Sequence, residues 1–315
     1  MDGQMDVPRF SFIMPAYNAA SVIGHAIESV QKQTFLDWEL VVTDDGSTDA
    51  TAAVVGAYRI NDPRIKLISQ KNAGCGAARD TSAQNAIGRY LVRFDADDEL
   101  MPNYLERMDS AILTYPGHDI YCCNGITRLP DGTTALARKG ELYETPQNFK
   151  LEDMFEFVHI FTIALFSSEI YHKVGHIDPH VYCEDVSFWF DAFLHGATCQ
   201  YIPEKLAYYT VSDTQMTSDF AQVGNSCIGI YRSLIEGGRL TKEQVALAEK
   251  AIERTCNDLA IFQKRNALVK RIDKVFGPHV GKVVSALIHG VGKAVRPLYA
   301  KVLSSKRAQG ESRGR

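Results

Sequence analysis

The sequence lacks the cysteine spacing of a disulfide-bonded or zinc-binding protein. Its seven cysteines stand at irregular positions, include no Cys-x-x-Cys pair and leave an odd thiol. A disulfide framework and a structural zinc site are therefore excluded as organising features. We expect the chain to fold in a reducing compartment.

Long apolar runs are also missing. No stretch approaches the roughly 18 apolar residues of a membrane span. The acidic N-terminal segment, residues 1–6, has neither the basic region nor the apolar run of a signal peptide. We therefore expect a cytoplasmic protein. Its 315 residues, 45% of them hydrophobic, are enough for one large or two modest globular domains.

Two common phosphate-binding motifs are absent. The sequence contains no GxGxxG, which Gly74-Cys-Gly76 only partly resembles, and no GxxxxGK[ST] loop. A dinucleotide cofactor is therefore not expected. We assign Gly74 and Gly76 to turning the backbone, and Arg79, one helical turn later, to contact with a phosphate.

Charge is distributed unevenly, although the net charge is only −4. Residues 264–315 hold 13 Lys or Arg against Asp273 and Glu311, which leaves −15 for residues 1–263. This division predicts an acidic catalytic part and a basic end that meets an anionic surface.

Apolar residues recur every three or four positions between 280 and 303, with basic side chains between them and Pro297 as a kink. Such a helix could pack on its own domain. Its basic face fits an anionic membrane surface better, and we expect residues 276–315 to make the protein peripheral on the inner face of the membrane. Nucleic acid is not an expected partner, because the interleaved aromatic and basic residues of a binding groove are missing.

What is present is an alternation of strands and helices. Apolar runs predict strands at 10–15, 38–43, 65–68 and 90–94, each followed by a helical segment. This order predicts a doubly wound, mainly parallel α/β sheet. A further strand is expected at 119–123, a turn at 129–132, a loop at 133–150 and helices over 220–275.

Ligands of such sheets bind at the carboxyl ends of the strands. Asp45, Arg79, Asp95 and Asp97 follow three separate strands and are therefore predicted to share one crevice. Asp95 and Asp97, separated by one residue, could hold one hard cation together with substrate phosphates. Alternatively, these acids and Asp98 are solvated residues that a helix N-terminus favours.

Four segments in this order closely resemble the signatures of family 2 glycosyltransferases, which have the GT-A fold. They are Phe12–Asn18 (FIMPAYN), Val42–Asp49 (VTDDGSTD), Asn72–Arg79 (NAGCGAAR) and Phe94–Asp98 (FDADD). The similarity extends to Cys183–Asp185 (CED), about two thirds of the chain. It implies an inverting transferase that uses a nucleotide-sugar donor.

The resemblance also implies roles for residues on the donor side. Pro15, Tyr17 and Asn18 would line the nucleotide base and ribose. Asp45 would hydrogen-bond the base, and Arg79 would meet the base or the diphosphate.

The same resemblance implies which residues bind the metal and which one acts as the general base of catalysis. Asp95 and Asp97 would be the DxD pair, the first toward the ribose and the second on Mg²⁺ or Mn²⁺. Glu184 and Asp185 begin a predicted helix, whose dipole alone could explain them. In the family such a pair carries the general base, for which we choose Asp185, with Glu184 orienting the acceptor or the base.

Two positions depart from the family. Val211-Ser212-Asp213 stands where many relatives place a metal-binding His, so Asp213 or water would have to replace it. Asp80 stands where Asn is usual.

We therefore expect a GT-A catalytic domain at 8–215, a helical extension at 216–275 and a basic amphipathic helix and tail at 276–315. The expected function is transfer from a nucleotide-sugar, a UDP-sugar, to a glycan or lipid-linked acceptor in cell-surface polysaccharide synthesis. The alternatives are a GT-A-like nucleotidyltransferase, whose lysine-bearing phosphate loop is missing, and a non-catalytic membrane-associated adaptor with the same fold.

Overall fold

The computed structural model of the chain describes residues 7–212 and 219–276. The amphipathic segment at 280–303, the basic tail and Asp213 lie outside these residues, so the predictions made for them remain predictions.

The described residues form one ten-stranded mixed sheet. Its strands are β1 (Phe10–Ala16), β2 (Trp38–Asp44), β3 (Ile65–Ser69), β4 (Tyr90–Arg93), β5 (Glu99–Leu100), β6 (Ile120–Arg128), β7 (Thr134–Leu136), β8 (Gln147–Phe149), β9 (Ala164–Ser167) and β10 (Cys199–Thr210).

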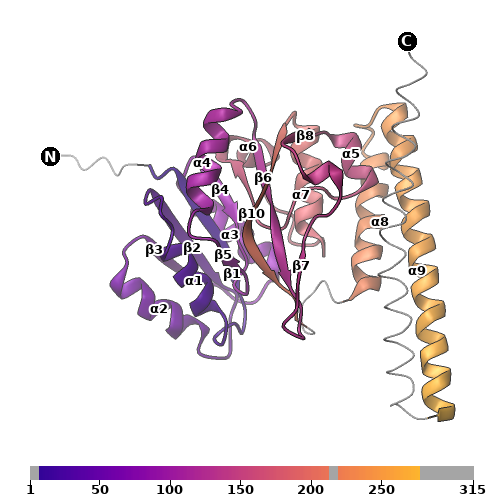
Figure 1. Ribbon diagram of the computed structural model, residues 1–315, viewed down its shortest axis with the longest axis horizontal. Helices are drawn as coiled ribbons and strands as arrows, with labels where there is room; N and C mark the ends of the chain where they lie inside the picture. The colour runs from indigo at the N-terminus through magenta and orange to yellow at the C-terminus, as the bar shows by residue number, and fades with distance from the viewer. Residues whose placement is uncertain (1–6, 213–218, 277–315) are drawn as a thin grey trace. The chain divides into compact units, whose positions relative to one another are not determined.

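The helices in the described ranges complete the fold (Figure 1). They are α1 (Ile23–Gln31), α2 (Thr51–Asn61), α3 (Cys75–Gln84), α4 (Tyr104–Thr114), α5 (Leu151–Glu156), α6 (Ser168–Val174), α7 (Glu184–Leu194), α8 (Phe220–Glu236) and α9 (Lys242–Phe276), with a short 3-10 turn at Glu141–Tyr143. None of them combines the length and hydropathy that crossing a bilayer requires.

The order of the strands confirms the predicted doubly wound, mainly parallel sheet. The main path runs β3-β2-β1-β4-β9-β6-β10-β5. The first four strands are mutually parallel, β9 is antiparallel to both β4 and β6, and β10 is again parallel to β6. The loops after β1, β2 and β4 therefore leave the sheet at the same edge, where ligands of such sheets bind.

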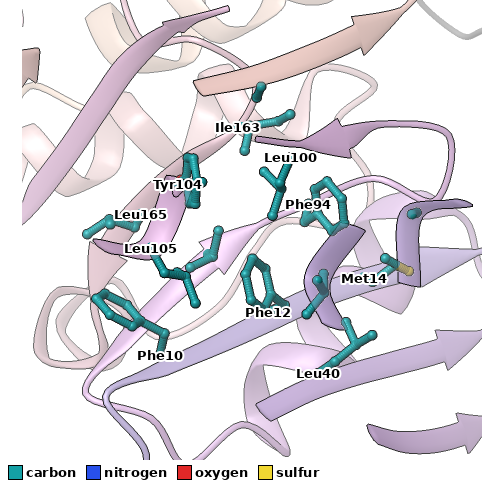
Figure 2. Packing of buried hydrophobic residues seen from close by; sticks show 14 of the residues in the cluster. Phe10, Phe12, Met14, Leu40, Phe94, Leu100, Tyr104, Leu105, Ile163 and Leu165 are labelled. Atoms are coloured by element: carbon teal, nitrogen blue, oxygen red, sulfur yellow. The ribbon is translucent and has the colours of Figure 1, made fainter. Parts of the chain in front are cut away.

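Burial on both faces of the sheet explains the unbroken apolar run of β1. Phe10, Phe12 and Met14 point into a cluster that α1 and α4 cover (Figure 2). Ile13 faces the opposite cluster, which α3, α6 and α7 cover. Each fully buried large apolar side chain contributes roughly 1.5–3 kcal/mol, so this strand anchors the edge that carries the site.

A compact unit extends to Ile252, within α9, and the rest of α9, from Glu253, belongs to a second unit. Ile230 and Tyr231 of α8 and Ala248 of α9 belong to the same buried cluster as α7. The predicted division at 215 and 275 stays a prediction.

The prediction of a loop at 133–150 is wrong, because β7 and β8 lie within these residues. β7 pairs with β6 across a turn in which Gly132 has φ +79°. β8 pairs with β10, about fifty residues further along the chain, so no local pattern marks it. Helix α3, which follows the third strand, ends at Gln84. A Cβ at Gly88 would lie 2.4 Å from Ser11 Oγ, so glycine allows the chain to pass this close to β1.

Candidate active site

The loops after β1 and β2 are joined by hydrogen bonds. Asn18 has a left-handed backbone, φ 49°, and its Oδ1 accepts from the Thr48 backbone N at 2.8 Å. The Asn18 N–H donates to Ser47 Oγ at 2.9 Å. Beside it, Pro15 is buried in β1 and Tyr17 is 52% exposed. Tyr17 thus offers an aromatic face at the edge where a nucleotide base is expected.

Asp45 shapes the loop that precedes α3. This buried carboxylate accepts from the backbone N–H of Ala73 at 2.9 Å and of Gly74 at 2.8 Å, and from Gln70 Nε2 at 2.8 Å. Gly74 has φ +95°, a conformation that favours glycine, which confirms its role in turning the backbone. The structure thus joins Asp45 to the start of the helix that carries Arg79, and its bond to a base stays a prediction.

Arg79 projects from α3 into a buried group of charges. Its Nη2 donates to Asp95 Oδ1 at 2.6 Å, and its Nε donates to Glu184 Oε1 at 3.1 Å. The side chain is 2% exposed, and its Nη1 is buried without a protein partner among the described residues. The two hydrogens of this buried Nη1 group therefore have no acceptor among the described residues, which is an unsatisfied position that an oxygen of a ligand or water would stabilise.

Arg93, the last residue of β4, is the functional candidate that the sequence did not reveal. Its Nη1 donates to Asp95 Oδ2 at 3.2 Å and to the Thr162 carbonyl at 3.0 Å. Its Nη2 donates to Glu184 Oε1 at 3.1 Å and lies 3.9 Å from Asp185 Oδ2. We name Arg79, Arg93, Asp95, Glu184 and Asp185 the charge cluster.

The charge cluster joins three parts of the sequence. α3 and β4 supply the two arginines, Asp95 follows β4, and the first turn of α7 supplies both remaining acids. Glu184 begins α7, as predicted, and is 4% exposed. The two arginines compensate most of the charge of the three carboxylates. An unpaired ion buried at this depth would cost too much free energy.

The arginines act differently on the three acids. Burial opposes ionisation of Asp95, but Arg79 and Arg93 overcome it and lower its pKa to about 2. Burial also opposes ionisation of Glu184, but Arg93 and Arg79 overcome it and hold the pKa of Glu184 below its usual range. Burial raises the pKa of Asp185, and Arg93 only partly opposes this. Asp185 is thus the acid of the three whose pKa the fold raises, which favours a proton acceptor.

Asp97 and Asp98 complete the acidic turn. Asp97 is half-buried. Asp98 is 1% exposed, and its Oδ1 accepts from the Thr210 backbone N at 3.1 Å, which ties the turn to β10. Burial raises the pKa of Asp98 well above its ordinary value. Its role is therefore to connect the turn to the sheet.

A dication fits this turn only together with a ligand. Within the described ranges, no three His, Cys, Asp or Glu side chains converge closely enough to hold a metal by themselves. Both oxygens of Asp95 accept from arginines, whereas Asp97 is half-buried at the edge of the turn. Mg²⁺ commonly uses one or two carboxylates and substrate phosphates, so this donor set suits a cation that arrives with a diphosphate.

Two further contacts explain residues noted in the sequence. Gly76 allows a close approach rather than a turn, because a Cβ there would lie 3.1 Å from Asp178 O and from Pro179 Cα. Asp80 Oδ1 accepts from Tyr171 Oη at 2.9 Å and from Ile177 N at 2.8 Å, so it fixes the loop that leads to α7. Both positions are structural.

Comparison with known sequences agrees with the arrangement of the motifs. The sequence model described as Glycosyl transferase family 2 matches residues 11–175. An uncharacterised glycosyltransferase of Rickettsia prowazekii (strain Madrid E) is 23% identical over 95% of this chain and 98% of its own. The UDP-Glc:alpha-D-GlcNAc-diphosphoundecaprenol beta-1,3-glucosyltransferase WfgD of Escherichia coli is 43% identical over 110 residues, which are 35% of this chain and 43% of its own.

Solved structures share the fold. TarS 1–349 of S. aureus in complex with UDP-GlcNAc has a TM-score of 0.64 at 18% identity, over 84% of this chain and 76% of that one. The mannosyltransferase PcManGT of Pyrobaculum calidifontis, in complex with GDP-Man and Mn²⁺, has a TM-score of 0.57 at 17% identity, over 89% and 86% of the two chains. The predicted GT-A fold is confirmed.

Proposed function

Because the chain belongs to glycosyl transferase family 2, we propose that it is an inverting enzyme that moves a sugar from a UDP-sugar to a glycan or lipid-linked acceptor in cell-surface polysaccharide synthesis. The observation that carries this proposal is the charge cluster. It joins Arg79 and Asp95, from two of the donor motifs, to Glu184 and Asp185, which lie 89 to 106 positions later in the sequence.

Relatives support the choice of donor and acceptor. WfgD is named for transfer from UDP-Glc to a diphosphoundecaprenol-linked sugar. TarS was crystallised with UDP-GlcNAc, and a mannosyltransferase of the same fold was crystallised with GDP-Man and Mn²⁺. We accordingly propose a nucleotide diphosphate at the edge formed by Tyr17, Asn18 and Asp45, and Mg²⁺ or Mn²⁺ as the cofactor.

The protein side chains would divide the work as follows. Arg79 would donate from Nη1, which has no acceptor among the described residues, to the base or diphosphate. Asp185 would take the proton of the acceptor hydroxyl as that oxygen attacks the anomeric carbon opposite the leaving diphosphate. Glu184, fixed by both arginines, would orient Asp185. A cation bound by Asp97 and the diphosphate, with Asp95 adjacent, would stabilise the negative charge on the leaving nucleotide.

The test is nucleotide release from a panel of UDP-, GDP- and dTDP-sugars with Mn²⁺. We expect Asp97→Ala to weaken donor binding. Asp185→Ala should lower transfer by about 100-fold or more, the usual contribution of a general base, with little effect on donor affinity. Asp131→Ala, an exposed acid in the turn before β7, is the matched control and should behave like the parent. Release rates that are equal in all four proteins would refute the mechanism.

A further inference from the structure

A second cationic group lies outside the charge cluster, at Arg138 in the coil after β7. Asn124 of β6, which is 3% exposed, fixes the backbone on both sides of this residue. The Arg138 N–H donates to Asn124 Oδ1 at 3.0 Å, and Asn124 Nδ2 donates to the Arg138 carbonyl at 3.0 Å. The arginine is thus held in place by the sheet although it lies in a coil.

The guanidinium of Arg138 is bound by carbonyl groups alone. Its Nη2 donates to the carbonyls of Val158 and Ile160, both at 3.1 Å. Weaker contacts join Nε to His159 O at 3.5 Å and Nη1 to Ala137 O at 3.4 Å. A guanidinium has five N–H donors. These bonds therefore leave one Nη1 hydrogen of this half-buried side chain without an acceptor among the described residues.

The positive charge of Arg138 is poorly compensated. Within the described part of the chain it forms no ion pair, whereas Arg79 and Arg93 each contact carboxylates at 3.2 Å or less. Burial lowers the pKa of Arg138, and Asp185 is the carboxylate whose charge acts in the opposite direction. An arginine stays protonated under these conditions, so a buried cation of this kind favours an incoming anion.

The neighbours of Arg138 belong to the acceptor side of the proposed site. The coil at 157–163 that binds its guanidinium also supplies the Thr162 carbonyl to Arg93. Phe157 lies 5.2 Å from the guanidinium and is 52% exposed. An exposed aromatic ring beside a fixed cation suits a ligand with an apolar part next to an anionic one.

We propose that Arg138 binds an oxyanion of the acceptor, either a phosphate or a carboxylate, while Phe157 contacts the adjoining apolar group. This inference rests on the proposed function and adds to it the chemical class of the acceptor.

The experiment is calorimetric titration of the full chain with butyl phosphate, butanoate and butyl glucoside, at saturating UDP and Mn²⁺ so that the donor site is filled. We expect an anion to bind the parent, and Arg138→Gln to weaken that binding by about tenfold, as loss of a charge-assisted hydrogen bond does. Affinity for neutral butyl glucoside should not change. Arg107→Gln, at an exposed pair with Glu204, is the matched control.

The outcomes separate the sources of the anion and the two proposals. Tighter binding of butyl phosphate assigns a phosphate-bearing acceptor, and tighter binding of butanoate assigns an acidic sugar. Equal anion affinity in the parent and Arg138→Gln, or no anion binding by the parent, overturns the inference. If Arg138→Gln does not fold, Arg138→Lys should still bind the anion at least about threefold more weakly, because ammonium lacks the planar fork. Failure of UDP to bind contradicts the proposed function instead, and the comparison of variants still decides the inference.

Discussion

At the scale of single residues, Arg93 connects the two sides of the proposed site. It contacts Asp95 on the donor side, and Glu184 and Asp185 on the acceptor side. Arg79 contacts Asp95 at 2.6 Å and Glu184 at 3.1 Å, whereas Arg93 also lies 3.9 Å from Asp185. The two arginines should therefore differ in what their loss affects.

We predict that Arg93→Met lowers transfer to the acceptor by about 100-fold, because Asp185 loses its nearest cation and its orientation. UDP affinity should stay within about threefold of the parent, since Arg79 still holds Asp95. The measurement compares transfer with hydrolysis of the donor by water. Arg93→Lys should recover part of the transfer rate. Transfer and hydrolysis falling by the same factor would show that Arg93 only stabilises the fold.

The sequence revealed most residues of the site but not their bonds. Asp45, Arg79 and Asp95 follow strands that end at one edge, which the alternation of elements predicts. Arg93 was not identified from the sequence, because a single basic residue in a short strand does not indicate whether its side chain is buried or exposed to solvent. Its partner Glu184 lies 91 positions away, so only the folded chain shows that both are buried together.

At the scale of elements, the loop before α7 is positioned by its contact with α3. Gly76, in the first turn of α3, lies against the backbone of Asp178 and Pro179, and the site of its missing Cβ is 3.5 Å from Glu184 Cβ. The spacing between these two elements therefore sets where the carboxylates of the charge cluster lie.

We predict that Gly76→Ala destabilises the protein by about 1–3 kcal/mol, the usual cost of overpacking, and lowers transfer as α7 is displaced. Gly56→Ala in α2 is the matched control, because nothing lies within 4 Å of the added methyl group. It should gain about 0.5–1 kcal/mol from helix propensity. Urea unfolding measures the change in the free energy of unfolding, which should fall for Gly76→Ala and rise for Gly56→Ala. A Gly76→Ala protein that is more stable than the parent would contradict the close contact between α3 and the loop before α7.

Elements were predictable where their signal is local. The four parallel strands of the first half and the helix at Glu184 follow from apolar periodicity and were found. β7, β8 and β9 have only three or four residues each. β8 and β9 form by pairing with strands far away in the sequence, β10 and β4 respectively. The residues of β7 (TAL) and β8 (QNF) carry no pattern that separates them from a loop, and those of β9 (ALFS) form an apolar run too short to distinguish a strand from a buried helix.

At the scale of the whole molecule, the charge cluster makes stability depend on acid. The pKa of Asp95 is about 2 in the fold against an ordinary value of 3.8. A lowered pKa stabilises the fold at pH values above the ordinary one, and this contribution disappears as the pH falls toward the lowered value. Asp185 and Asp98, whose pKa values burial raises, act in the opposite sense.

We predict that Asp95 contributes about 2 kcal/mol of pH-dependent stability at neutral pH and that about half of this remains at pH 3. Urea unfolding of the parent and of Asp95→Asn at pH 6 and pH 3 measures it. The gap between the two proteins should narrow by about 1 kcal/mol on acidification. If this difference in unfolding free energy stayed constant or grew on acidification, the arginines would not be what lowers the pKa of Asp95.

The basic end should govern binding to membranes. Residues 264–315 carry 13 Lys or Arg against two acids, and each base near an anionic surface contributes about 1 kcal/mol. We predict that the full chain sediments with liposomes that contain phosphatidylglycerol and that removal of residues 276–315 abolishes this at physiological salt. Neutral phosphatidylcholine liposomes are the control. Undiminished sedimentation after truncation would assign membrane binding elsewhere.

The long sequence separation within the charge cluster has a consequence for biosynthesis. Arg79 and Arg93 leave the ribosome about a hundred residues before Glu184 and Asp185. A nascent chain that stops short of α7 has two guanidinium groups and only Asp95 to neutralise them, so this part of the sheet cannot close around its charges. Premature termination before residue 184 should therefore yield fragments that chaperones and proteases recognise, rather than a smaller working domain.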